Sequence, residues 1–115
     1  MTKYITFGSP PIGKEEINAV TKCMKTGWIG TGPLVKKFEN SFAKYSNSKY
    51  AVAVGSCTAA LHLSLNSIAL NKGDEVIVPA MTFCSTVNSI IHSGYTPVLA
   101  DVDLHTMNID PDEIE

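Results

Sequence analysis

The fold is decided by residues 50–101, which read YAVAVGSCTAALHLSLNSIALNKGDEVIVPAMTFCSTVNSIIHSGYTPVLAD. Three short apolar runs in this stretch have the continuous hydrophobicity of strands that are covered on both faces. Two longer segments between the runs have the pattern of helices. The predicted elements are strands at residues 50–54, 75–78 and 96–101 and helices at residues 58–70 and 83–93. Their order predicts an α/β fold of parallel βαβαβ units with right-handed crossovers.

The residues before this stretch predict two more helices joined by a glycine-rich loop. Apolar residues three and four positions apart indicate amphipathic helices at residues 13–26 and 34–46. Residues 27–33 read GWIGTGP, and three glycines and a proline favour a shaped loop. At the other end, Asp110 followed by proline and acids is typical of a helix start. Because barely one helical turn remains before Glu115, we expect the sequence to continue.

The composition indicates a globular chain and excludes several kinds of partner. Of 115 residues, 44% are hydrophobic and 17% are charged, so the chain can bury a core. The net charge of −2 and the lack of a dense Lys/Arg stripe give no support for nucleic acid or an anionic membrane as a partner. Three widely spaced cysteines contain no CxxC pair, so neither a zinc site nor a disulfide framework is predicted. A reducing cytoplasm is the expected location.

The turn at residues 55–59, GSCTA, is the first candidate site. Its small residues allow a ligand close to the backbone, and free N–H groups at a helix start favour an anion, so the turn could hold a phosphate. It lacks a Walker or dinucleotide fingerprint, and an ordinary turn with a capping hydroxyl explains the same residues. A weaker hypothesis makes Cys57 the nucleophile of an elbow related to G-x-S-x-G. That motif would require glycine in place of Ala59, and nothing marks a base among the three histidines.

Other candidate residues follow the predicted strands. In a parallel α/β sheet ligands gather beyond the carboxyl ends of the strands, where Thr58 and Phe83 are both predicted to lie. Phe83 could stack on a flat cofactor ring, although packing in the core is the commoner role of a single aromatic residue. Asp101 and Asp103 could contact a metal, but Asp is common in turns and the remaining ligands are absent. We therefore predict no metal site.

Four motifs in a fixed order resemble a known family. The motifs are GWIGTGP at residues 27–33, AVAVGSCTA at 51–59, GDEVIVPAMTF at 73–83 and PVLADVD at 97–103. Together they resemble the DegT/DnrJ/StrS family of nucleotide-sugar aminotransferases, which depend on pyridoxal 5′-phosphate (PLP). The match runs from Phe7 to Glu115, and four motifs in order are far more specific than any one of them.

The resemblance implies a fold and a domain organisation. Residues 1–115 would form the N-terminal part of the large domain of a fold-type I PLP-dependent enzyme. Residues 1–49 would be a helical arm with a substrate loop, and residues 50–115 would be the βαβαβ portion. The cofactor contacts implied by the family are the phosphate contacts of Cys57, Thr58 and Ala59 and the stacking of Phe83 on the pyridine ring. The nucleotide-sugar side of the pocket would be lined by Gly8, Ser9, Trp28, Ile29, Gly30 and Thr31.

The resemblance also implies a reaction and its limits. The full-length enzyme would move an amino group from an amino acid, typically glutamate, to a nucleotide-linked keto sugar for polysaccharide biosynthesis, as a cytoplasmic homodimer. PLP chemistry needs a Schiff-base lysine and an acid on the pyridinium nitrogen, and both lie downstream of the matched region in the family. We therefore assign no catalytic residue and expect this chain to be inactive alone. Two other interpretations remain: a fragment of a related PLP-dependent sugar dehydratase, and a non-catalytic module that binds phosphate ligands or pairs with a full-length relative.

Overall fold

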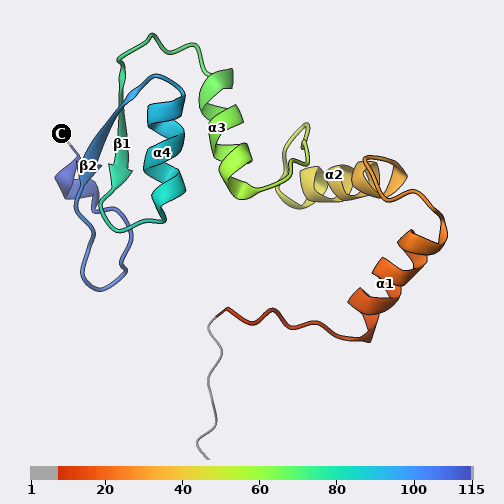
Figure 1. Ribbon diagram of the computed structural model, residues 1–115. Helices are drawn as coiled ribbons and strands as arrows, with labels where there is room; N and C mark the ends of the chain where they lie inside the picture. Colours follow the sequence, from red (N-terminus) through yellow and green to blue (C-terminus); the bar gives the residue numbers. More distant parts are fainter. Residues whose placement is uncertain (1–7, 115) are drawn as a thin grey trace, which may run out of the picture. The chain divides into compact units, whose positions relative to one another are not determined.

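The chain forms two compact units, Met1–Ala53 and Val54–Glu115, and the computed structural model describes residues 8–114 (Figure 1). The first unit is helical, and the second combines helices with a small parallel sheet. None of the helices in the described part of the chain is both long and apolar enough to cross a membrane. Because the second unit combines helices with parallel strands, the architecture is α/β, as the sequence predicted.

The first unit contains two amphipathic helices, α1 (Lys14–Lys25) and α2 (Pro33–Tyr45). At the start of α1, the N–H of Gly13 donates to Oε2 of Glu16 at 2.7 Å, half of a capping arrangement. α2 begins with Pro33 at its first position. Proline lacks a backbone N–H, and the N–H at this position would have no acceptor within the helix. Both helices lie within one residue of their predicted bounds.

The second unit is built around two parallel strands. Its elements, in chain order, are α3 (Cys57–Ser67), β1 (Glu75–Pro79), α4 (Cys84–His92), β2 (Thr96–Ala100) and the 3-10 turn η1 (Pro111–Glu113). β1 and β2 are in register from Glu75 opposite Thr96 to Pro79 opposite Ala100. Because α4 connects these strands, the predicted β-α-β unit at residues 75–101 is confirmed.

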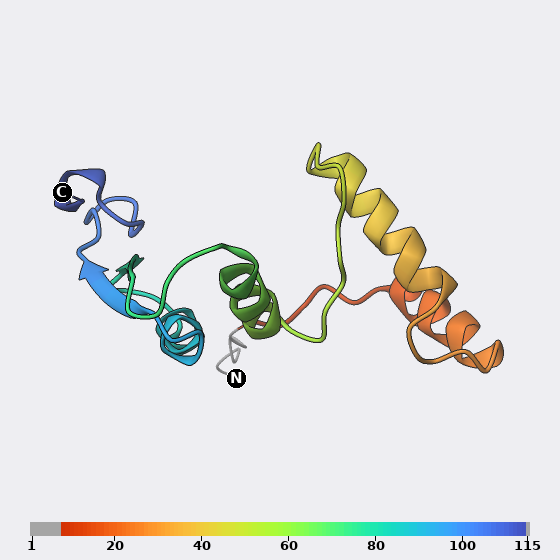
Figure 2. The ribbon, with the colours of Figure 1, turned by 90° about the horizontal axis from the view of Figure 1, so that it is seen from above.

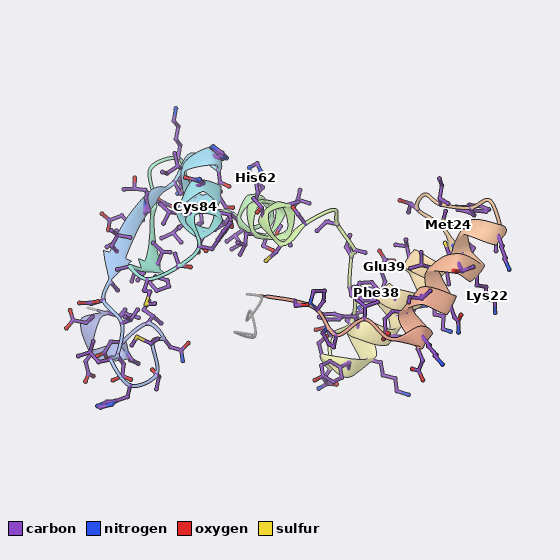
Figure 3. All side chains as sticks on the ribbon, turned by 60° about the horizontal axis from the view of Figure 1, so that its bottom comes forward. Lys22, Met24, Phe38, Glu39, His62 and Cys84 are labelled. Carbon is purple, nitrogen blue, oxygen red and sulfur yellow. The ribbon has the colours of Figure 1, made fainter. Side chains whose placement is uncertain are left out.

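The predicted strand at residues 50–54 is wrong. The structure assigns no strand to this segment, and within the described residues the sheet contains β1 and β2 alone. The N–H of Ala53 donates at 3.0 Å to Oε1 of Glu39 on α2 instead of to a neighbouring strand. Glu39 is labelled in Figure 3. Val52 is largely exposed. A strand requires a partner for its ladder as well as apolar residues, so the sheet here has two strands where the sequence predicted three.

Two helix ends also differ from the prediction. α3 ends at Ser67 and not at Leu70, because Ile68 adopts an extended conformation with φ −89° and ψ 139°. After Asp110 the chain makes the single 3-10 turn η1. The cap itself is as predicted, since Oδ1 of Asp110 accepts from the N–H of Asp112 at 3.0 Å.

The core of the second unit is small and lies between the sheet and α4. Its buried apolar residues are Val78 of β1, Ile90 of α4 and Ala100 of β2. Seen from above, α4 lies beside the sheet and α3 lies on the far side of α4 (Figure 2). The opposite face of the sheet is not covered by a helix in the described residues, and Ile77 and Leu99 there remain exposed. The alternation of buried and exposed residues follows the two-residue period of a strand.

Two glycine turns hold the strands in register at their N-terminal ends. The N–H of Gly73, before β1, donates to the carbonyl of Gly94, before β2, at 3.0 Å. Both residues have positive φ, 89° and 83°, which glycine adopts without the steric cost that a Cβ would add. The hydroxyl of Thr96 adds a bond of 3.3 Å to the carbonyl of Gly73. These contacts set where the two strands begin.

Candidate functional site

The first candidate site lies at one end of the second unit. The phenol of Tyr95, just after α4, donates to the carbonyl of Leu65 near the end of α3 at 3.4 Å. His62 of α3 and His92 at the end of α4 have ring centroids 6.3 Å apart. Both contacts show that the two helices run in the same sense, as Figure 1 also shows. The N-termini of α3 and α4 therefore share the end of the unit at which β1 and β2 finish, which is where an α/β sheet holds ligands.

The N-terminus of α3 offers unpaired backbone donors. Oγ of Ser56 accepts from the N–H of Ala59 at 3.1 Å, and the carbonyl of Ser56 accepts from the N–H of Ala60 at 3.0 Å. The N–H groups of Cys57 and Thr58, the first two of the helix, have no acceptor among the described residues. Two such donors at the positive end of a helix dipole suit a phosphate.

The structure thus adds Ser56 to the candidate residues and shows that the N–H of Ala59 already has an acceptor. Sequence reasoning treated a capping hydroxyl as the alternative to a phosphate site and did not single out Ser56. Its position directly before the helix, within a run of small residues, was the available signal. The predicted role of Ala59 requires its N–H to leave Oγ of Ser56 or to share its proton. Capping and phosphate binding are therefore compatible at Cys57 and Thr58 but compete at Ala59.

The nucleophile interpretation of Cys57 gains nothing from the structure. Cys57 is exposed, and no hydrogen bond links its thiol to a histidine among the described residues. His62, the nearest histidine in sequence, lies against the ring of His92. A nucleophile and its base need to lie within hydrogen-bond reach. The arrangement that the elbow hypothesis requires is therefore not formed.

Phe83 stands at the same end of the unit and is not a core residue. It is the N-cap of α4, and its carbonyl accepts from the N–H of Thr86 at 2.9 Å. Its side chain is 75% exposed. Packing in the core, the commoner role of a single aromatic residue, does not occur in the described structure. The ring is accessible for stacking on a planar ligand.

Asp101 and Asp103 are engaged in turns. Oδ1 of Asp103 accepts from the N–H of Thr106 at 2.7 Å and from the N–H of His105 at 3.2 Å. The bonds from Thr106 are the main cause that holds the pKa of Asp103 below its usual value, because they favour the carboxylate. Oδ1 of Asp101 accepts from the N–H of Val102 at 2.8 Å. The described residues contain no group of three or more His, Cys, Asp or Glu side chains that could hold a metal.

The second candidate site is the loop between α1 and α2 in the first unit. The indole N–H of Trp28 donates to the carbonyl of Thr31 at 2.9 Å, so the loop closes on its own side chain. The backbone N–H of Trp28 donates to Oγ1 of Thr26 at 3.2 Å, and the thiol of Cys23 contacts the carbonyl of Trp28 at 3.4 Å. These bonds fix the loop to the end of α1.

A groove of about 680 Å³ runs along this loop. The predicted residues Trp28, Ile29 and Gly30 line it. Thr31 does not line the groove, and its carbonyl instead positions the indole. Gly8 and Ser9 are exposed and lie outside the lining.

Replacing Gly32 by alanine is expected to displace the indole of Trp28. A Cβ at Gly32 would clash with Nε1 of Trp28, whereas a Cβ at Gly30 would meet nothing within 4 Å. We expect Gly32→Ala to destabilise the first unit by about 1–3 kcal/mol and to shift the emission of Trp28. Gly30→Ala is the matched control and should leave both unchanged. Urea unfolding followed by tryptophan fluorescence measures both, and equal behaviour of the two variants would contradict the packing described here.

The chain belongs to the DegT/DnrJ/EryC1/StrS aminotransferase family, whose model matches residues 10–115. One relative is the spore coat polysaccharide biosynthesis protein SpsC of Bacillus subtilis (strain 168). The two sequences are 51% identical over 112 residues, which make up 97% of this chain and 29% of that protein.

The chain is also similar to solved structures of aminotransferases and of a sugar dehydratase. A protein of Streptococcus pneumoniae described as a sugar aminotransferase, in its PMP form, matches with a TM-score of 0.85 and 40% identity, over 96% of this chain and 28% of that one. The aminotransferase from Psychrobacter cryohalolentis matches with a TM-score of 0.83 and 38% identity, over 91% and 27%. The GDP-4-keto-6-deoxy-D-mannose-3-dehydratase of E. coli, with bound hydrated PLP, matches with a TM-score of 0.81 and 33% identity, over 89% and 28%. The chain spans less than a third of the length of these relatives.

Proposed function

We propose that this chain supplies the N-terminal part of a PLP-dependent aminotransferase that moves an amino group from an amino acid, typically glutamate, to a nucleotide-linked keto sugar. One observation carries the proposal. Two backbone N–H groups without an acceptor and an exposed aromatic ring lie at the same end of the second unit. The donors belong to Cys57 and Thr58, and the ring belongs to Phe83. Membership of the aminotransferase family supports the same conclusion.

The residues present fit the cofactor. The N–H groups of Cys57 and Thr58 would bind its phosphate, with Ala59 joining if Oγ of Ser56 turns away. Phe83 would stack on its pyridine ring. When bound, PLP supplies an electron sink for reactions at the carbon that carries the amino group. The part of this chain is to hold and orient the cofactor, and no described residue is assigned a proton transfer.

The first unit would supply the proposed contacts with the nucleotide sugar. Trp28, Ile29 and Gly30 would contact the nucleotide sugar from the groove, with Thr31 holding the indole in place. Gly8 and Ser9 belong to the same proposed side of the pocket. We also propose that the full-length protein acts in the cytoplasm as a homodimer, with residues 1–49 as the arm and residues 50–115 as part of the large domain.

A PLP-dependent sugar dehydratase is the second candidate. It is favoured by one observation, namely that GDP-4-keto-6-deoxymannose-3-dehydratases match this chain with TM-scores up to 0.86 at 32–33% identity. The aminotransferases matched here have 38–40% identity, which favours the first candidate.

Mass spectrometry of the sugar product of the full-length protein distinguishes the two candidates. Transfer of nitrogen from glutamate to the sugar would support transamination. Loss of a sugar hydroxyl without gain of nitrogen would support dehydration.

The proposal is tested by adding PLP to the purified chain. Binding is followed by the near-ultraviolet and visible absorbance of the cofactor, before and after borohydride, with the intact mass of the chain. We expect saturable binding that needs the phosphate, so pyridoxal without phosphate should bind more weakly, and no lysine should be modified stoichiometrically. Equal binding of PLP and pyridoxal would overturn the proposed phosphate site. A stable adduct at one lysine would overturn the expectation that the chain lacks the cofactor-linking residue.

A further inference from the structure

Two histidines from neighbouring helices lie together in the second unit. His62 is in the middle of α3, and His92 is the last residue of α4. Their ring centroids are 6.3 Å apart, and the ring planes are inclined at 65°. The two residues are far apart in sequence, so the packing of α3 against α4 brings them together. Neither residue belongs to the proposed cofactor or substrate contacts.

The nitrogen atoms of both imidazole rings are available to a ligand. In the part of the chain that the structure describes, no hydrogen bond or ion pair engages a ring nitrogen of His62 or His92. His62 is half-buried and His92 is exposed, so the pair can be reached from solvent. A neutral imidazole with a free nitrogen is the commonest protein ligand of transition metals. The pair therefore offers two such ligands at one place.

The separation of the rings suits one shared ion. A metal bonded to an imidazole nitrogen at about 2.0–2.1 Å lies about 3 Å from the ring centroid, and two rings at a tetrahedral angle then have centroids about 5 Å apart. The observed distance of 6.3 Å is about 1 Å longer than this value. A rotation of the exposed His92 side chain closes that difference, while the half-buried His62 stays in place.

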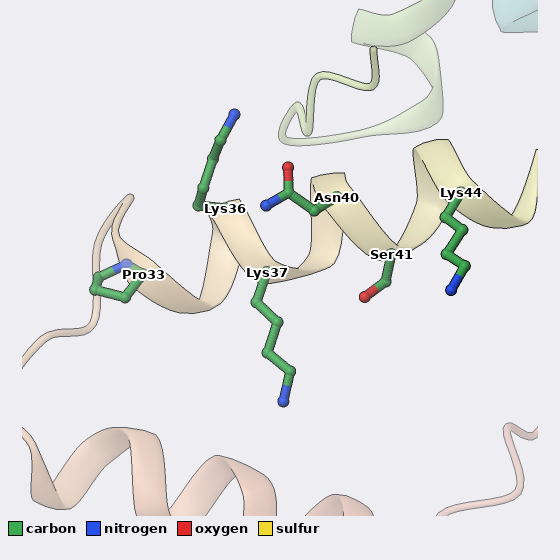
Figure 4. Close-up of a pocket in the computed structure, with 6 residues that line it drawn as sticks. All are labelled: Pro33, Lys36, Lys37, Asn40, Ser41 and Lys44. Atoms are coloured by element: carbon green, nitrogen blue, oxygen red, sulfur yellow. The ribbon is translucent and has the colours of Figure 1, made fainter. Parts of the chain in front are cut away.

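The charges of the second unit favour a cation at this position. His92 ends α4, where the last carbonyls form the negative end of the helix dipole. Residues 54–114 contain seven carboxylates and one lysine, Lys72, whose side chain lies near the turn after α4. The field of this unit is therefore negative. In the first unit, by contrast, α2 carries several cations, namely Lys36, Lys37 and Lys44 (Figure 4).

We propose that His62 and His92 together bind one divalent transition-metal ion, with Zn²⁺ as the expected species, and that the ion links α3 to α4. Two imidazoles supply two of the four ligands that zinc prefers, and water fills the other positions. The site is therefore weaker than a structural zinc site and exchanges its ion. The sequence predicted no metal site, because nothing in it places residues 62 and 92 together.

The ion would join the two helices that carry the proposed cofactor contacts. α3 begins with the N–H groups of Cys57 and Thr58, and α4 begins next to Phe83. His92 lies at the opposite end of α4, about 12 Å along the axis from Cys84 at a rise of about 1.5 Å per residue. The metal site is thus separate from the proposed phosphate site and does not depend on it.

Titration of the purified chain with Zn²⁺ tests the proposal. The ring signals of the three histidines are followed by nuclear magnetic resonance. We expect the signals of His62 and His92 to shift together and to saturate at one equivalent, while those of the exposed His105 stay unchanged. EDTA should reverse the shifts. Mg²⁺ should produce none, because it prefers oxygen ligands.

Variants at the three histidines identify the ligands. His62→Gln and His92→Gln should each weaken Zn²⁺ binding at least tenfold in calorimetry, because each removes one of two ligands. His105→Gln is the matched control and should bind Zn²⁺ as the natural chain does. Zn²⁺ should slow hydrogen exchange of the α3 amides in the natural chain and in the control, but not in the other two variants. Circular dichroism confirms that each variant keeps its helices.

The exposed thiols of Cys57 and Cys84 are the rival ligands for Zn²⁺. Alkylation of the thiols with iodoacetamide before the titration should leave the histidine shifts unchanged. Loss of these shifts after alkylation, separate titration of His62 and His92, equal effects of the three substitutions, or no shift in a folded chain would overturn the proposal.

PLP binding by the unmodified chain reports on the proposed function separately. PLP binding without Zn²⁺ binding would overturn the metal site alone. Zn²⁺ binding at the two histidines without PLP binding would overturn the proposed function and leave the metal site supported.

Discussion

Ile90→Ala is expected to lower the free energy of unfolding of the second unit by about 2–5 kcal/mol. Ile90 is 3% exposed, and it is one of three apolar residues that are buried in the described structure. Its removal leaves a cavity between α4 and the sheet, where so small a core has no other residue to fill it. Hydrogen exchange of the β1 and β2 amides, or urea unfolding followed by circular dichroism, measures the loss.

The matched control lies at the next position of the same helix. Ile91 is 53% exposed, so Ile91→Ala removes the same atoms without opening a buried cavity. We expect a loss of less than about 1 kcal/mol for this variant. Equal losses at the two positions would show that α4 does not face the sheet as described.

Cys57→Pro is expected to weaken PLP binding by roughly 10- to 150-fold, which corresponds to the loss of a hydrogen bond to a charged group of about 1.5–3 kcal/mol. Proline removes the N–H that would meet the cofactor phosphate, and it is well tolerated at the first position of a helix. Ser56 before it is already extended, with φ −162° and ψ 162°, as a residue preceding proline must be. The change is therefore confined to one donor.

Cys57→Ala completes the comparison, because it removes the thiol and keeps the N–H. It should bind PLP as the natural chain does, with affinity followed by cofactor absorbance. If alanine weakened binding as much as proline, the thiol and not the backbone would be the contact. If proline had no effect, the phosphate would lie elsewhere.

The helices and the parallel strand pair could be predicted from the sequence because their signals are local. Apolar spacing placed α1 and α2 to within one residue of their observed bounds. Local signals could not determine whether residues 50–54 form a strand. Its apolar run is the same whether or not a neighbouring strand is present, and pairing is a property of distant residues.

The sequence could indicate which residues form the candidate site, but not which of their backbone N–H groups lack an acceptor. The sequence favoured donors at the start of α3, and the structure shows which of them are free. It could not show that Ser56 engages Ala59, since that depends on one side-chain rotamer. For Phe83, the exposure of the residue excludes core packing within the described structure, and its stacking on a cofactor ring stays a prediction.

The bond between Gly73 and Gly94 has a consequence for mutational tolerance. Both residues need positive φ, and neither belongs to the proposed cofactor or substrate contacts. In a library of random variants selected for a folded product, every replacement at these two positions should be depleted, with asparagine the least so. A survey guided by ligand contacts alone would rank the pair as neutral, so intolerance here would report on the geometry of the turns and not on chemistry.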